Sequence, residues 1–136
     1  MMISVKGIDH VVFRTTRLDD MLHFYSTVLG CKLERSLPPD TGLYQLRAGG
    51  SLIDLVTVDS ELGKAGGGPP RQEGRNVEHV CLLLTNVAEG DLIDYLDSVG
   101  IVCEPFTARY GATGFGRSTY IRDPEGNIVE LKLEAS

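Results

Sequence analysis

Two short stretches decide the fold: residues 8–12 read IDHVV and residues 77–81 read VEHVC. Each surrounds one histidine, His10 or His79, with β-branched and other apolar residues. Runs of this kind are typical of strands, in which alternate side chains share a face. Because the same pattern occurs twice in one chain, we interpret it as an internal repeat of two related modules.

The repeat continues on the C-terminal side of both stretches. An amphipathic segment follows each of them and runs to a glycine, Gly30 in the first half and Gly100 in the second, which suits a helix C-terminus. Farther on, LIDL at residues 52–55 matches IVEL at residues 128–131. The pattern predicts helices over 18–29 and 88–98, and strands over 7–14, 31–37, 42–48, 51–58, 77–84, 101–107, 117–122 and 127–133.

Each half therefore reads β-α-β-β-β. We predict an α+β fold in which two βαβββ modules form a cupped mixed sheet with the helices on the outside. The first module covers residues 5–58 and the second residues 77–134, joined by a mobile linker at 59–76 that is rich in Gly and Pro. Neither half alone looks able to cover its sheet, so we expect residues 1–136 to form a single domain.

Composition limits the classes of function. The chain has 136 residues, 42% of them hydrophobic, and a formal net charge of −6 without any cluster of Lys and Arg, which excludes nucleic acid as a partner. No apolar run approaches the roughly 18 residues of a membrane span, and the N-terminus lacks a secretory signal. Three cysteines without a CxxC pair argue against a disulfide framework. We expect a cytoplasmic protein that acts on a small molecule.

Four ionisable residues lie among apolar neighbours in the predicted strands: His10, His79, Asp54 and Glu130. Strand alternation places each of them opposite the wholly apolar face that should pack against a helix. A carboxylate in the middle of a strand needs a cation or a donor. Two histidines with one carboxylate suit zinc, and equally iron, manganese, nickel or cobalt. We predict that His10, His79 and Glu130 hold a divalent metal, and that Asp54, one methylene shorter than Glu130, ligates directly, through water, or not at all.

Four stretches of the chain carry a family resemblance: GIDHVVF at 7–13, FYSTVLG at 24–30, VEHV at 77–80 and, most specifically, YIRDPEGNIVEL at 120–131. Through them the chain resembles the vicinal oxygen chelate superfamily, which includes glyoxalases, bleomycin-resistance proteins, fosfomycin-resistance enzymes and extradiol dioxygenases. The likeness extends over residues 7 to 133.

The resemblance implies paired βαβββ modules and a divalent metal (Zn, Ni, Mn, Co or Fe) held by His10, His79 and Glu130. The metal would bind two vicinal oxygens of a small substrate and act as a Lewis acid. In an isomerisation of the glyoxalase type, Glu130 would be the catalytic residue that shuttles the proton. Asp54 stands where glyoxalases of this family usually carry Glu or Gln, a departure that counts against glyoxalase activity itself.

The segment from Arg109 to Ser118 is rich in glycine and fits neither a Walker loop nor a dinucleotide fingerprint. We interpret it either as a flexible hairpin loop or as a lid over the metal, similar to a loop of fosfomycin-resistance enzymes. In the second case Arg117, Ser118 and Tyr120 would bind an anionic substrate in a cleft beside the metal. Arg14 would also face this cleft.

The leading hypothesis is thus a metal-dependent lyase or isomerase of the glyoxalase type. Alternatives are an epoxide-opening enzyme of the fosfomycin-resistance type, a small extradiol-type dioxygenase, and a drug-sequestering protein of the bleomycin-resistance type, which typically lacks the metal ligands. We also predict a homodimer, with the site inside one chain or shared across the dimer.

Overall fold

The structure, a computed structural model, describes residues 2–135. It divides into two compact units, the first ending at Arg71 and the second beginning at Gln72. This boundary lies inside the segment 59–76 that the sequence identifies as the linker. Each unit is described below by itself.

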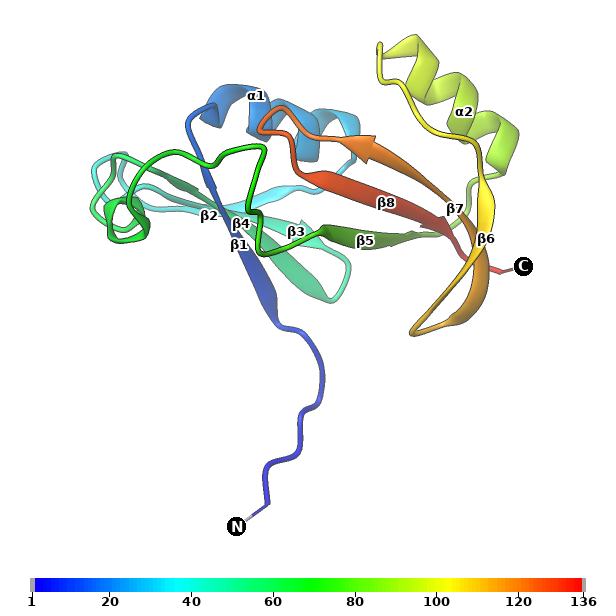
Figure 1. Cartoon of the computed structure of the whole chain (residues 1–136), viewed down its shortest axis with the longest axis horizontal. Helices are drawn as coiled ribbons and strands as arrows, with labels where there is room; N and C mark the ends of the chain where they lie inside the picture. Colours follow the sequence, from blue (N-terminus) through cyan, green and yellow to red (C-terminus); the bar gives the residue numbers. More distant parts are fainter. Residues whose placement is uncertain (1, 136) are drawn as a thin grey trace. The chain divides into compact units, whose positions relative to one another are not determined.

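The first unit is a βαβββ module that carries a four-stranded sheet (Figure 1). Its strands follow the order β1-β4-β3-β2, with β1 parallel to β4 and the other pairs antiparallel. Its elements are β1 (His10–Thr15), α1 (Leu18–Leu22), the π-helix η1 (His23–Val28), β2 (Leu33–Ser36), β3 (Leu43–Ala48), β4 (Ser51–Thr57) and the 3-10 helix η2 (Gly63–Gly66).

The second unit repeats this topology. Its strands follow the order β5-β8-β7-β6, again with the first strand parallel to the last and the remaining pairs antiparallel. Its elements are β5 (His79–Leu84), α2 (Glu89–Ser98), β6 (Thr107–Gly111), β7 (Gly114–Arg122) and β8 (Ile128–Leu133). The predicted fold of two βαβββ modules is confirmed, with the strands divided between two four-stranded mixed sheets.

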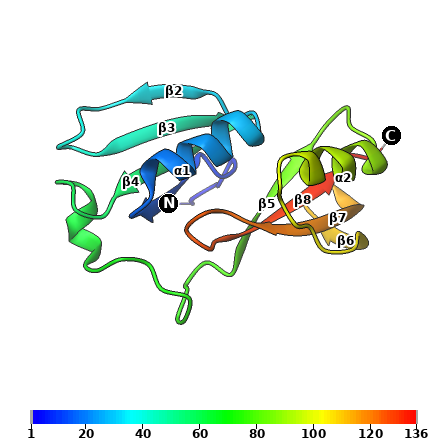
Figure 2. The ribbon, with the colours of Figure 1, turned by 90° about the horizontal axis from the view of Figure 1, so that it is seen from above.

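Strand alternation gives each sheet one face covered by its helix, as Figure 2 shows. The buried side chains of the first unit come from both layers and include Phe13, Met21, Tyr25, Leu46, Ile53 and Leu55. Those of the second unit include Leu92, Leu96, Ile121, Val129 and Leu131. Full burial stabilises by about 1.5–3 kcal/mol for each large apolar side chain. The packing leaves the opposite face of each sheet available for polar residues.

The helical segment of the first unit changes character along its length. The predicted helix is continuous in position, but its second part, His23–Val28, is a π-helix. Phe24 and Tyr25 are both buried there, with exposed fractions of 5% and 0%. A wider helical turn reduces the angle between successive side chains, which lets two neighbouring aromatic rings reach the same core. Gly30 ends the segment at a φ of +77°, as the sequence predicts.

One strand assignment from the sequence is wrong. The predicted strand 101–107 has no ladder before Thr107; β6 begins at that residue and extends to Gly111, into the segment interpreted from the sequence as a loop. Pro105 lacks the N–H that a ladder requires, whereas the later residues pair along a hairpin that turns between Gly111 and Gly114. The segment Arg109–Ser118 is therefore a paired β-hairpin. No helix within residues 2–135 is long and apolar enough to cross a bilayer.

Candidate metal centre

The second unit brings one histidine and one carboxylate together on the sheet face opposite α2. In the parallel pair β5–β8, Glu130 lies opposite Cys81, two residues beyond His79. The Nε2 atom of His79 lies 3.0 Å from Oε1 of Glu130, and Glu130 is only 6% exposed. The carboxylate of Glu78 lies 3.2 Å from the other ring nitrogen, Nδ1. The imidazole of His79 thus stands between two carboxylates.

Residues of the hairpin formed by β6 and β7 lie beside His79 and Glu130. Tyr120 on β7 pairs with Glu130, and its ring meets the ring of His79 edge-on at a centroid distance of 5.3 Å. The guanidinium of Arg109 lies over the Tyr120 ring, 4.4 Å from its centroid, a cation–π arrangement. Nη1 of Arg109 also donates to the carbonyl oxygen of Ser118 at 2.6 Å and to its hydroxyl at 2.9 Å.

Cys81 lies on the same sheet face as His79 and Glu130. Desolvation, together with the charge and hydrogen bond of the neighbouring Glu130 carboxylate, raises the pKa of its thiol to about 11. The thiol therefore stays protonated near neutral pH.

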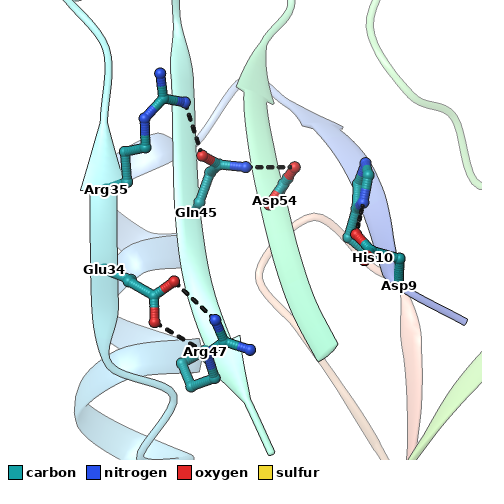
Figure 3. A network of polar contacts seen from close by, with 7 residues as sticks. All are labelled: Asp9, His10, Glu34, Arg35, Gln45, Arg47 and Asp54. Carbon is teal, nitrogen blue, oxygen red and sulfur yellow. Dashed lines mark hydrogen bonds and ion pairs between the residues drawn. The ribbon is translucent and has the colours of Figure 1, made fainter. Parts of the chain in front are cut away.

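The first unit places its own histidine and acid at the same register (Figure 3). Asp54 on β4 lies opposite Val12, two residues beyond His10. Asp54 is 2% exposed, and its Oδ2 accepts a hydrogen bond of 3.2 Å from Nε2 of Gln45. Arg35 donates in turn to Oε1 of Gln45 at 3.0 Å. Oδ1 of Asp54 is buried and has no hydrogen-bond partner.

His10 is oriented by the residue before it. Its Nδ1 lies 2.6 Å from Oδ1 of Asp9, which leaves Nε2 for a further partner. The hydrogen bond to Asp9 raises the pKa of His10 against the opposing effect of desolvation, and the charge of Asp54 raises it further. Metal-binding histidines commonly engage a carboxylate through their second ring nitrogen, as His10 and His79 both do here.

Two of the predicted substrate-binding residues have other partners. Arg117 was grouped with Ser118 and Tyr120, but successive strand residues alternate faces, and Arg117 forms an ion pair with Glu89 of α2. Arg117 therefore lies on the helix-covered face, whereas Ser118 and Tyr120 lie on the face of Glu130.

Arg14 does lie on the same side of β1 as His10, but its guanidinium donates to the backbone. Its nitrogens contact the carbonyl oxygens of Gly63 at 2.9 Å, Gly68 at 2.8 Å and Gly67 at 2.5 Å. Arg14 therefore anchors part of the predicted linker to the first sheet. These contacts use the donors that Arg14 would need to bind a substrate.

Sequence reasoning missed the residues that hold the acids. Gln45 occupies in the first sheet the position that Tyr120 has in the second, directly opposite the acid. The alternation of residues 42–48 puts Gln45 on the polar face, but only the strand register pairs it with Asp54. Arg109 was part of a predicted loop, and the pairing of that loop into a hairpin brings its side chain to Tyr120.

The donors present suit a divalent cation. Each unit offers one imidazole and one buried acid. Nε2 of His10 is left for a further partner, and Nε2 of His79 contacts the carboxylate of Glu130. A cation would satisfy the buried Oδ1 of Asp54, which has no hydrogen-bond partner. Within the described residues, no three His, Cys, Asp or Glu side chains form a ready-made ligand cluster.

Comparison with known proteins places the chain in a family. Residues 7–131 match the Glyoxalase/Bleomycin resistance protein/Dioxygenase superfamily. The chain belongs to this superfamily, which confirms the resemblance seen in the sequence.

Individual proteins resemble this chain in sequence or in structure. Biphenyl-2,3-diol 1,2-dioxygenase 3 of Rhodococcus globerulus is 31% identical over 133 residues; the match covers 92% of this chain but only 62% of the dioxygenase. Virulence protein STM3117 of Salmonella typhimurium is 28% identical over 128 residues, covering 93% of this chain and 83% of that protein. An integron cassette protein from the mobile metagenome of V. Pseudocholerae superposes with a TM-score of 0.76 and 25% identity, covering 100% of both chains.

Proposed function

We propose that this protein is a metal-dependent enzyme of the lyase or isomerase type, acting on a small substrate whose vicinal oxygens chelate a divalent metal. His10, His79 and Glu130 would hold the metal, and Asp54 would add a carboxylate directly or through water. The proposal places this site either within one chain or in a homodimer, and a monomer by sedimentation would contradict the dimer. A cytoplasmic location stays a prediction.

The observation that carries the proposal is the duplicated histidine–acid register. In both units the acid lies two residues beyond the strand position paired with the histidine, and a carboxylate at the preceding position holds Nδ1. Packing alone does not require two histidines to be oriented in the same way at equivalent positions of two modules. A requirement for two imidazole ligands explains both.

The bound metal would act as a Lewis acid on the substrate oxygens. Glu130 is the chain's own candidate for moving a proton, since its buried carboxylate already contacts Nε2 of His79. A buried carboxylate placed beside the substrate can exchange a proton with a carbon or oxygen of the substrate. Tyr120 lies against the same imidazole and would orient the substrate beside it.

Ring cleavage of a vicinal diol is the second candidate function. It is supported by the 31% identity to a biphenyl-2,3-diol 1,2-dioxygenase, although this chain spans about three fifths of the length of that enzyme. Two histidines and one carboxylate are also the ligand set of ferrous oxygenases.

Elemental analysis of the purified protein tests the metal. We expect about one divalent ion per chain, with stoichiometric loss in the H79A and E130Q variants and a substantial loss in H10A. His23 is exposed at the start of η1, so H23A is a matched control that should keep its metal. Wild-type protein that takes up no metal, or equal losses in H23A and H79A, would contradict the proposal. Metal-loaded protein is then screened with glutathione hemithioacetals, fosfomycin and catechols.

A further inference from the structure

Arg109 is a half-buried cation on the same sheet face as Glu130, and its hydrogen-bonding capacity is only partly used. Its Nη1 atom donates to Ser118, while Nε and Nη2 have no partner within residues 2–135. The plane of the guanidinium rests on the Tyr120 ring, which in turn contacts His79. A short chain of contacts thus links the unpaired edge of Arg109 to a candidate metal ligand.

Three other arginines of the chain have an anionic partner, whereas Arg14 and Arg35, like Arg109, donate to neutral groups. Arg17, Arg47 and Arg117 each pair with a carboxylate, from Asp20, Glu34 and Glu89 respectively. Arg109 contacts only neutral groups: a carbonyl oxygen, a hydroxyl and an aromatic ring. Removing a cation from water without an anionic partner is unfavourable, so a half-buried guanidinium with idle donors is suited to receive an anion from outside the chain.

We infer that Arg109 binds an oxyanion group of the substrate, a carboxylate or a phosphonate, and so selects acids among compounds with vicinal oxygens. The inference rests on the proposed function for the vicinal oxygens and adds the charge of the substrate. The two idle nitrogens belong to a planar fork that matches two oxygens of one anion. Tyr120 fixes the plane of that fork through the cation–π contact.

Catechol and 3,4-dihydroxybenzoate, which differ by one carboxylate, test the inference. A third ligand, 3,4-dihydroxyphenylphosphonate, replaces the carboxylate with a phosphonate. Dissociation constants are measured by calorimetry on the metal-loaded wild-type protein. We expect the acid to bind about tenfold or more tightly than catechol, the range of a charge-assisted hydrogen bond. A larger preference for the phosphonate than for the carboxylate assigns the site to phosphonates, and the reverse order assigns it to carboxylates.

The variants R109Q and R109K separate recognition from folding. R109Q should lose the preference for the acid while its affinity for catechol stays within about twofold, and R109K should keep part of the preference because the charge remains without the fork. R71Q removes the same charge from an exposed residue that makes no described contact, and should behave like the wild type. Equal affinity of the wild type for catechol and the acid, or a preference that survives in R109Q, would overturn the inference.

Repeating the titrations on metal-free protein distinguishes this inference from the proposed function. If catechol affinity is unchanged without metal, chelation of vicinal oxygens is refuted. An Arg109-dependent preference for the acid in that same sample still supports the anion site. A preference for the acid that is equal in R109Q and wild type refutes Arg109 while leaving a metal-dependent affinity for catechol intact.

Discussion

The two units place different side chains around the buried acid on their polar sheet face. In the second unit a glutamate reaches the histidine, with Nε2 of His79 and Oε1 of Glu130 3.0 Å apart. In the first unit an aspartate occupies the equivalent register but is held by Gln45, and His10 turns its Nδ1 to Asp9. One methylene and one neighbour on the adjacent strand decide whether acid and imidazole meet. In the proposed metal site, His79 and Glu130 would therefore bind the ion more strongly than His10 and Asp54.

The largest expected effect comes from removing each acid in turn. E130Q should weaken metal binding by about 100-fold or more, because it removes a proposed ligand. The loss of a residue that only supports a ligand typically costs about 10–100-fold. D54N should cost about tenfold if Asp54 binds through water. Competition with a fluorescent chelator gives both values. Equal losses would show that Asp54 ligates as directly as Glu130 and would break the distinction between the units.

The next effect concerns the hydrogen bond that holds Asp54. Q45L leaves a buried carboxylate with neither oxygen satisfied, which should destabilise the metal-free protein by about 1–3 kcal/mol. Urea unfolding, followed by a spectroscopic signal from the first unit, measures the change in the free energy of unfolding. The double variant Q45L/D54L is the control that removes both hydrogen-bond partners. Recovery in the double variant is expected; a loss that persists would trace the cost to packing of Gln45.

A smaller effect is expected at the residues before the histidines. The pKa of His10 is raised mainly by its hydrogen bond to Asp9, so D9N should lower that pKa toward its ordinary value. Because the folded pKa of His10 is raised, its stabilising contribution is complete below the unfolded pKa and disappears as pH rises through the folded pKa. NMR titration of the imidazole in metal-free protein reports the shift. An unchanged pKa of His10 in D9N would remove Asp9 as its cause.

The smallest effect is expected on the helix-covered face of the second unit. The guanidinium of Arg117 lowers the pKa of Glu89, so this pair stabilises above the unfolded pKa of Glu89 and loses its contribution as pH falls through the folded pKa. E89Q should therefore lower the melting temperature slightly at neutral pH, and the difference from wild type should vanish in acid. Arg117 is exposed and Glu89 is partly exposed, so solvent screening keeps the effect small. A difference that grows in acid would refute this origin.

Much of the fold follows from local pattern. Repeated strands with one histidine each, glycines after the amphipathic segments and the turn at residues 123–127 all have short-range causes. In that turn the Asp123 carboxylate accepts hydrogen bonds from the backbone N–H groups of Glu125 and Asn127, and Gly126 adopts a φ of +88°. Strand alternation likewise suffices to place His10, His79, Asp54 and Glu130 on polar faces.

The failures lie where pairing partners decide. Residues 101–107 resemble a strand in composition but have no ladder before Thr107, and the glycine-rich segment after them is paired. Arg117 and Tyr120 are close in sequence yet belong to opposite faces, which only becomes clear once the strand is known to extend through both. Arg14 faces the expected side but is used by the carbonyl oxygens of the linker.

The sequence by itself determined the duplication, the topology of each module and the identity of the candidate ligands, because these depend on periodicity and on the chemistry of single residues. The tertiary structure alone decided which side chains hold the ligands: Gln45 against Asp54, Glu78 and Tyr120 against His79, and Arg109 against Tyr120. Such contacts depend on strand register, which is set by the packing of whole sheets and leaves no local signature in the chain.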